Sequence, residues 1–270
     1  MNSHTLGEVY LDGVGLIGSG LTGWHDSAAV LAQPSLLVLG PLKIPVPESL
    51  PAAERRRVGN QIKMALAAGR EATLHAGQDA ASLANIFSAS HGDGDNCHAI
   101  CEVLAGSDRS ISPTRFHNSV HNAAAGYWGI AMKCMAPSTS LCAFDGSFAA
   151  GLLEACVQSL TSRSASLLVA SDAPYPEPLN GARPMEYGFA VGLVIQAVQT
   201  EKAIAKLRLS LTHEAPDRLQ HQDLERLRAG CPAARSLPLL IELASSSSQT
   251  RTIHLEYLAN CALTIRLENI

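Results

Sequence analysis

Aromatic and charged side chains are both scarce in this 270-residue chain. Phe, Trp and Tyr make up 4% of the residues and Asp, Glu, Lys and Arg together 16%, whereas hydrophobic residues make up 47%. Such an apolar composition excludes an intrinsically disordered chain. Because aromatic residues are few, the core must consist largely of Ala, Leu, Val and Ile, which allow close packing of helices on sheets. We expect a folded protein with one large domain or two small ones.

The sequence also lacks a basic surface, a membrane-spanning run and a targeting signal. Its formal net charge is -4, so we expect no nucleic-acid partner, because binding to phosphates requires a basic face. The one basic run, Arg55–Arg57, predicts a solvated helix face, with docking of an acidic carrier domain as the alternative. No apolar stretch reaches the roughly 18 residues of a membrane span. Residues 1–5 contain no charged region followed by an apolar one, so we expect no leader peptide.

The seven cysteines show no paired spacing, which predicts free thiols and a cytoplasmic location. Two short clusters could bind a metal: Cys97 with His98 and Cys101, and His117 with His121. The first lacks a second ligand pair and the second lacks a helix-borne glutamate, so we expect no metal site.

Three glycines near the N-terminus, Gly13, Gly15 and Gly18, have the spacing of a dinucleotide-binding fingerprint. A further loop follows them instead of a helix, and no acidic residue ends a second strand about 20 residues later. We therefore expect a tight structural turn and no cofactor.

Predicted strands and helices alternate along the chain, which is typical of an α/β layered fold. The proline-rich stretch 34–51 predicts an extended surface connection between them. We expect strands at 9–18, 86–90, 138–144, 167–171, 192–198, 207–212, 238–244 and 252–258, and helices at 54–76, 97–104, 122–132, 146–160 and 223–229.

Several short motifs follow one another in a fixed order in the central part of the chain. Ser112-Pro113 precedes Asn122-Ala123-Ala124-Ala125-Gly126, and Ala136-Pro137 then leads into the strand at 138–144. Arg183-Pro184 and Gly188-Phe189-Ala190 come later, in a shortened loop. This order resembles that of β-ketoacyl synthases and their chain-length-factor partners, in the condensing-enzyme family of thiolase fold. That family has Ser-Pro, Asn-x-x-Ala-Gly, Gly-Pro, Arg-Pro-Phe-Asp and Gly-Phe-Val segments at these places.

The resemblance covers roughly residues 8–200 and implies a truncated thiolase-like fold, equivalent to the N-terminal half of a ketosynthase. We expect a central sheet with helices on both sides. Residues 8–200 would form the ketosynthase N-terminal-like domain, and 201–270 would supply shortened variant strands and a helix that pack on the same core.

The position of the family's nucleophilic cysteine falls on Asp145 when it is counted without a gap from Asn122 and Pro137. A condensing enzyme needs a thiolate at a helix N-terminus, where the helix dipole and backbone N–H groups lower the pKa of the thiol. A carboxylate cannot readily hold and transfer an acyl chain, so Asp145 predicts a helix N-cap and a non-catalytic protein. Cys142, inside the predicted strand, is the less favoured nucleophile and is otherwise interpreted as a buried core thiol.

The catalytic groups that active family members take from their second half are also missing here. The late histidines, His213, His221 and His254, do not lie in the family's Gly-Thr-Gly-Thr or Gly-His contexts. The resemblance therefore implies a chain-length-factor-type subunit in a heterodimer with an active ketosynthase, which would serve an acyl carrier protein. Type II polyketide and aryl polyene systems are the most similar assemblies.

In this family the strand before the nucleophile pairs across the dimer axis, which corresponds here to about 138–143. The candidates for the interface or the acyl tunnel are Ala125, Trp128, Gly129, Ser140, Cys142, Phe144 and Asp145. Two other functions stay open at this point. They are a stand-alone acyltransferase or condensing enzyme that uses Cys142, and an acyl-binding module.

Overall fold

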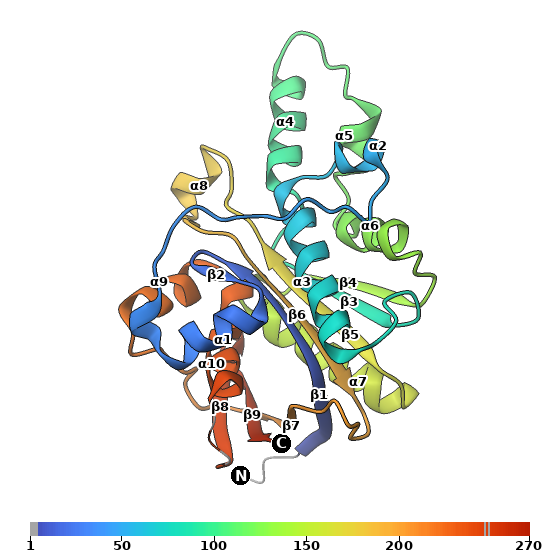
Figure 1. The fold of residues 1–270 in the computed structure, drawn as a ribbon. Coiled ribbons are helices and arrows are strands. Elements are labelled where there is room, and N and C mark those ends of the chain that lie inside the picture. Colours follow the sequence, from blue (N-terminus) through green and yellow to red (C-terminus); the bar gives the residue numbers. More distant parts are fainter. Residues whose placement is uncertain (1–4, 246, 248) are drawn as a thin grey trace.

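A computed structural model describes residues 5–245, 247 and 249–270, and a mixed nine-stranded sheet runs through it (Figure 1). The strand order is β4-β3-β5-β6-β1-β7-β9-β8, with the short β2 paired to β1. Strand β3 runs parallel to β4 and β5, and the other neighbours are antiparallel. The strands are β1 Thr5–Gly18, β2 Leu21–Thr22, β3 Ala84–Ser88, β4 Ser138–Leu141, β5 Ser166–Asp172, β6 Phe189–Gln196, β7 Ala205–Thr212, β8 Arg251–Leu258 and β9 Cys261–Asn269.

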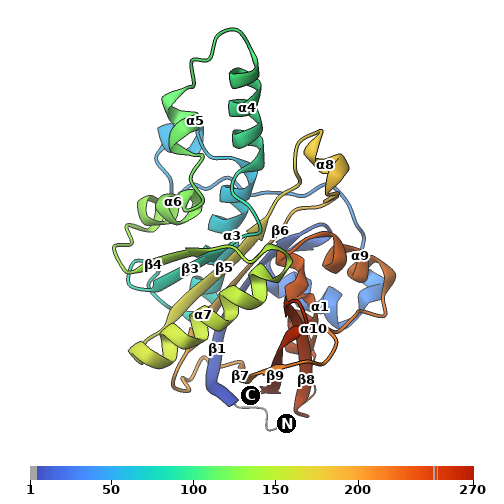
Figure 2. The same cartoon turned by 180° about the vertical axis from the view of Figure 1, so that it is seen from behind.

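Helices cover both faces of this sheet, as expected. Helix α3 lies on one face against β1, β6 and β5, and α7 lies on the opposite face against β5 and β3 (Figures 1 and 2). The α-helices are α1 Trp24–Ala32, α2 Ala52–Arg55, α3 Asn60–Ala76, α4 Gly94–Ala105, α5 Pro113–His117, α6 Ala123–Met132, α7 Ser147–Ser162, α8 Leu179–Ala182, α9 Gln222–Gly230 and α10 Leu237–Ala244. Three 3-10 turns, η1 Pro34–Leu36, η2 Phe144–Gly146 and η3 Ala233–Ser236, complete the described elements.

The glycines near the N-terminus allow α3 to lie directly on the sheet. A Cβ atom on Gly13 would lie 2.3 Å from the Ala72 carbonyl oxygen, and one on Gly15 would lie 2.0 Å from the Ala68 oxygen. Both glycines lie inside β1, so the tight turn expected at these glycines is wrong. Their role is the close approach of two backbones.

Polar side chains of α3 also bind the part of β1 that extends beyond β7. Strand β7 pairs with β1 only over Thr5–Leu11. Further along β1, the backbone N–H of Val14 donates to His75 Nδ1 (3.1 Å) and that of Leu16 donates to Glu71 Oε2 (2.8 Å). These bonds satisfy donors that would otherwise be unpaired in the sheet.

The C-terminal part of the chain continues the same sheet. Strand β7 pairs with β1, β9 pairs with β7, and β8 pairs with β9. Leu224, Leu240 and Ile253 belong to the same buried cluster as Leu11 and Phe148. The division of the chain at residue 200 stays a prediction.

Several element boundaries differ from the expected ones. Residues 238–244 form most of helix α10 and not a strand, because Pro238 lies in the first helical turn, where proline needs no N–H partner. The expected helix 54–76 is interrupted and resumes at Asn60, after Gly59. The strand expected at 192–198 lies at 189–196. Helices α1, α5 and α8 and strands β2 and β9 were not expected.

The structure also bears on the expectations about cysteines and membranes. All seven cysteines are free thiols. Among the described residues no helix is both long and apolar enough to cross a membrane. Residues 1–4, which carry most of the segment searched for a leader peptide, lie outside the described part of the chain.

Candidate functional site

The turn between β4 and α7 has a conformation that is unusual for its sequence. Phe144 has a left-handed φ of 50°, which costs a non-glycine residue roughly 1–2 kcal/mol. The Ser147 hydroxyl donates to the Phe144 carbonyl oxygen (2.7 Å) and accepts from the Ala143 N–H (3.0 Å), and so holds the turn. The hydrogen bonds of Ser147 therefore fix the backbone that carries the exposed Phe144 ring and the Asp145 side chain.

Two arginines bind the Asp145 carboxylate at this turn. Arg183 Nη2 donates to Oδ1 at 2.5 Å, and Arg235 Nη2 lies 3.0 Å from Oδ2. Arg235 pairs with Glu256 of β8 as well. The cap of α7 is Gly146, with no side-chain hydrogen bond, so the expected N-cap role of Asp145 is wrong. Its carboxylate instead joins three separate parts of the chain.

Cys142 lies just beyond the end of β4, where it is exposed. The expected strand was too long, and the interpretation of Cys142 as a buried core thiol is wrong. Its Sγ donates to the Ser90 carbonyl oxygen at 3.2 Å. In the described part of the chain no imidazole is hydrogen-bonded to this thiol, so it has no base in place.

A buried polar cluster lies beneath this turn and was not expected from the sequence. Asp172, at the end of β5, is fully buried and accepts from the Ser90 N–H (2.8 Å) and hydroxyl (2.7 Å). Burial raises the pKa of Asp172 to about 7. His91 Nε2 lies 3.9 Å from Asp172 Oδ1, and burial lowers the pKa of this imidazole. In the sequence, the one sign of this buried cluster is the aspartate that ends a strand of apolar and small residues.

A mainly apolar pocket of about 310 Å³ lies beside α4. Cys97 and Cys101, one helical turn apart, line it together with His91, Tyr175 and Leu179. The His91 and Tyr175 rings stack with their centroids 4.1 Å apart. Their spacing in the sequence suggested only metal ligands, whereas in the structure both thiols line the wall of a pocket.

Arg183 links this pocket to the turn. Its guanidinium carbon lies 3.7 Å from the centroid of the Phe144 ring and 5.8 Å from that of Tyr175. A cation over an aromatic face is attracted by the ring quadrupole. Arg183 therefore fixes both Asp145 and the aromatic side chains between the turn and the pocket.

The sheet ends at β4, which has β3 as its neighbour on one side and no strand on the other within the described chain. Helix α6 lies beside this edge (Figure 1). Large apolar side chains are exposed nearby: Ile130 at 46%, Met135 at 95% and Phe144 at 60%. An open strand edge flanked by apolar side chains is typical of an association surface.

The remaining candidate residues divide between this surface and the core. Ser140 of β4 and Ala125 and Gly129 of α6 are half-buried beside the open edge. Trp128 is fully buried, and a Cβ atom on Gly69 of α3 would lie 2.9 Å from its ring. Trp128 therefore packs in the core and does not reach the surface.

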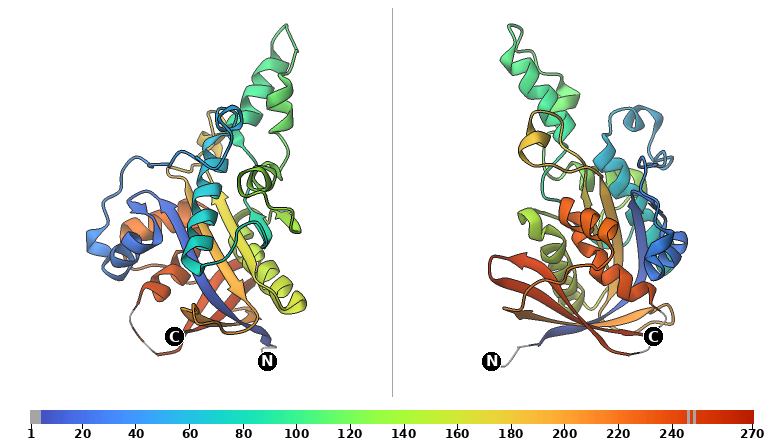
Figure 3. Two further views of the ribbon diagram at one scale, coloured as in Figure 1. Left: turned by 45° about the vertical axis from the view of Figure 1, so that its right-hand side comes forward. Right: turned by 90° about the vertical axis from the view of Figure 1, so that its left-hand side faces the viewer.

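Helices α4 and α5 together project beyond the rest of the molecule (Figure 3). They bury little of their own surface: Asn96 is the one buried residue of α4, and α5 has none. Phe116, which is 67% exposed, is the most accessible large apolar side chain of this projection.

The model of one protein family, described as β-ketoacyl synthase, N-terminal domain, matches residues 30–256. No curated protein matches the chain in sequence. Among solved structures, a chain of the ketosynthase ApeO in complex with its chain length factor ApeC from Xenorhabdus doucetiae superposes with a TM-score of 0.72 at 22% identity. That match covers 96% of this chain and 98% of the other.

Two further solved structures share this fold at lower sequence identity. The ishigamide ketosynthase/chain length factor gives a TM-score of 0.74 at 13% identity, covering 98% of this chain and 100% of the other. A type II polyketide synthase acyl-carrier protein in complex with its ketosynthase (AntDE:AntF) gives 0.74 at 11% identity, covering 98% and 99%. The thiolase-like fold expected from the sequence is thus confirmed.

Proposed function

Because the chain belongs to the β-ketoacyl synthase family, we propose that it is a non-catalytic subunit of chain-length-factor type that pairs with an active ketosynthase. One observation carries this proposal. The count from Asn122 and Pro137 assigns the nucleophile position to Asp145, and the carboxylate of this residue is bound by Arg183 and Arg235. A carboxylate held in two ion pairs is a poor nucleophile toward a thioester, and it cannot provide the thiolate that condensation requires.

The open edge of the sheet supports the pairing. In the proposed heterodimer β4 (Ser138–Leu141) lies antiparallel to the equivalent strand of the ketosynthase, so that one sheet crosses the interface. Burial of Ile130, Met135 and Phe144 then contributes about 25 cal/mol per Å² of apolar surface. The partner supplies the thiolate and the histidines, and the carrier protein delivers acyl chains to the complex.

The same complex would hold the growing acyl chain. We place its distal end near the β4–α7 turn, between the wall formed by α6 and the 310 Å³ pocket of α4. The apolar lining of that pocket suits a hydrocarbon or conjugated chain, since polar groups there are few. The products are polyketide or fatty-acyl chains, among them aryl polyenes, and we place the complex in the cytoplasm.

A stand-alone acyltransferase or condensing enzyme that uses Cys142 is the second candidate. The exposure of this thiol at the end of β4 favours it. Self-acylation at Cys142 distinguishes it from the non-catalytic subunit.

Co-expression with the ketosynthase encoded in the same gene neighbourhood tests the pairing. Size-exclusion chromatography with light scattering is expected to show one copy of each subunit. Met135→Glu with Ile130→Glu should prevent assembly, because both place charge in the apolar surface. The matched control is Val198→Glu, since Val198 is 66% exposed in the loop between β6 and β7. A stable monomer that ignores its candidate partner would contradict the proposal.

A further inference from the structure

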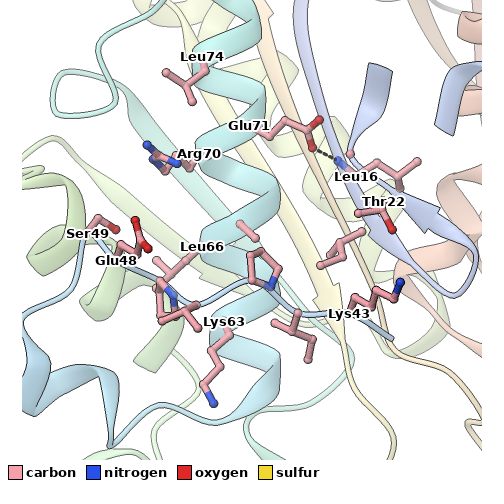
Figure 4. Close-up of a pocket in the computed structure, with 17 residues that line it drawn as sticks. Leu16, Thr22, Lys43, Glu48, Ser49, Lys63, Leu66, Arg70, Glu71 and Leu74 are labelled. Atoms are coloured by element: carbon pink, nitrogen blue, oxygen red, sulfur yellow. Dashed lines mark hydrogen bonds between the residues drawn. The ribbon is translucent and has the colours of Figure 1, made fainter. Parts of the chain in front are cut away.

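A pocket of about 650 Å³ lies on the face of the sheet that α3 covers. Residues 43–49 of the proline-rich stretch cross α3 there, and the end of β1 closes one side (Figure 4). None of the residues that line this pocket belongs to β4, α6 or the β4–α7 turn. It is therefore separate from the surface assigned to the ketosynthase partner.

The floor and walls of this pocket are apolar. Leu16 and Ile17 of β1 and Leu66 of α3 are buried at its base. Above them, Val46 and Leu74 remain 66% and 65% exposed although both line the same space. A ligand with an aliphatic chain would cover these two side chains, which the protein itself leaves open to water.

Three cations surround this apolar floor: Lys43 of the proline-rich segment and Lys63 and Arg70 of α3 (Figure 4). None of the three forms an ion pair with a carboxylate of the described chain. The acid nearest to the floor, Glu71, points toward β1 and accepts from the backbone N–H groups of Leu16 (2.8 Å) and Trp24 (2.5 Å).

Glu48 is the other acid of the lining, and it is exposed. The charged groups around the pocket are thus three cations against two carboxylates, one of which is already hydrogen-bonded to the backbone. Positive charge around an apolar floor selects a ligand with an anionic head and an aliphatic tail. The planar guanidinium of Arg70 matches a carboxylate with two parallel hydrogen bonds.

We propose that this pocket binds a medium-chain aliphatic carboxylate. The head group pairs with Arg70, and the tail lies along Leu16, Leu66 and Leu74. The volume falls within the range of about 300–1,000 Å³ that small-molecule sites occupy. This site does not depend on pairing with a ketosynthase, because the lining residues lie away from β4.

Isothermal titration with sodium decanoate tests the site on the purified chain or on its complex. Binding should strengthen from octanoate to decanoate, by up to about fourfold per buried methylene. Arg70→Gln should weaken decanoate binding at least about fivefold, in line with the loss of a charged hydrogen bond. Lys202→Gln, at a lysine outside the pocket, should leave it unchanged.

Ala67 of α3 also lines this pocket. Ala67→Trp therefore provides a second, independent variant, because the larger side chain fills the pocket without removing charge. It should abolish binding while circular dichroism stays that of the parent protein. The proposal is overturned if decanoate does not bind, if decyltrimethylammonium binds equally well, or if decanoate still binds to the Ala67→Trp variant. Assembly with the ketosynthase, measured in parallel, reports on the proposed function separately.

Discussion

Asp145 and Arg235 form an ion pair of 3.0 Å that joins the β4–α7 turn to the C-terminal part of the chain. The Arg235 side chain is only 12% exposed. It also pairs with Glu256 of β8, and a Cβ atom on Gly146 would clash with the Tyr257 carbonyl oxygen of the same strand. The β4–α7 turn, which carries Asp145, is therefore held against β8 of the C-terminal part of the chain.

Asp145→Asn is expected to destabilise the protein, because it leaves Arg183 and the mostly buried Arg235 with less compensation. Removing one partner of a fully buried pair costs about 3–5 kcal/mol. The Asp145 side chain is 34% exposed, so we expect a smaller loss of about 1–3 kcal/mol in the free energy of unfolding. Urea unfolding measures it, and Asp108→Asn at an exposed loop is the matched control. Equal stability of the two variants would mean that the ion pairs do not hold the tail.

The purified chain alone is expected to acquire no acyl group from acyl-carrier thioesters. Asp145 is neutralised by two arginines, and Cys142 has no hydrogen-bonded imidazole to activate its thiol. Intact-mass spectrometry checks this, with an active ketosynthase as the positive control. Stoichiometric acylation that disappears in Cys142→Ala would identify Cys142 as a nucleophile and favour the second candidate function.

The sequence predicted the order of elements well where local patterns are strong. The apolar run that becomes β5 and the long helix that becomes α7 lie within a few residues of their expected places. The sequence predicts a strand where α10 lies, because a short run of apolar residues fits either element. Pro238 is the residue that favours a helix here, since proline is common in the first helical turn. Strand β9 was missed although Asn260, with a φ of 60°, marks the tight turn before it.

The site was harder to predict because its residues meet only through tertiary contacts. The count from Pro137 identified Asp145, but its two arginines come from segments 38 and 90 positions later in the chain. The cluster of Ser90, His91 and Asp172 depends on the pairing of β3 with β5, which no local pattern reveals. The pocket beside α4 likewise needs the loop around Tyr175 to fold over it.

Asp172 predicts a specific dependence of stability on pH. Burial raises its pKa from 3.8 to about 7, so between these values the folded state binds a proton that the unfolded state has lost. The contribution of Asp172 to the free energy of unfolding is therefore fully present below pH 4 and falls as the pH rises. Above about pH 7 it is lost, which lowers the free energy of unfolding by an amount on the order of 4 kcal/mol. His91, Tyr175, Arg183 and Cys231 are the titratable or charged groups that face it.

Comparison with Asp172→Asn isolates this contribution, because the other groups titrate in both proteins. Urea unfolding from pH 4 to pH 8 should show the wild type losing stability relative to the variant until about pH 7, and a constant difference beyond it. Asp26→Asn, on the exposed side of α1, should show no such trend. A difference between wild type and Asp172→Asn that stays flat or rises over this range would contradict the prediction.

If this subunit sets product length, side chains that narrow the space beside the β4–α7 turn should shorten the products. Ala125→Phe and Gly129→Leu add bulk to α6, and Cys101→Phe fills the pocket of α4. Overpacking typically costs about 1–3 kcal/mol, which shifts the chain lengths that fit without preventing assembly. Gly230→Leu in α9, where a Cβ atom meets nothing within 4 Å, is the control.

Mass spectrometry of the products of each co-expressed complex gives the chain lengths, and size-exclusion chromatography confirms that the complex still forms. Shortening by Cys101→Phe alone would place the distal end of the chain in the α4 pocket. Shortening by Ala125→Phe or Gly129→Leu alone would place it against α6. Unchanged lengths across all three variants would remove the chain-length role, and the subunit would then be a structural partner that completes the sheet through β4.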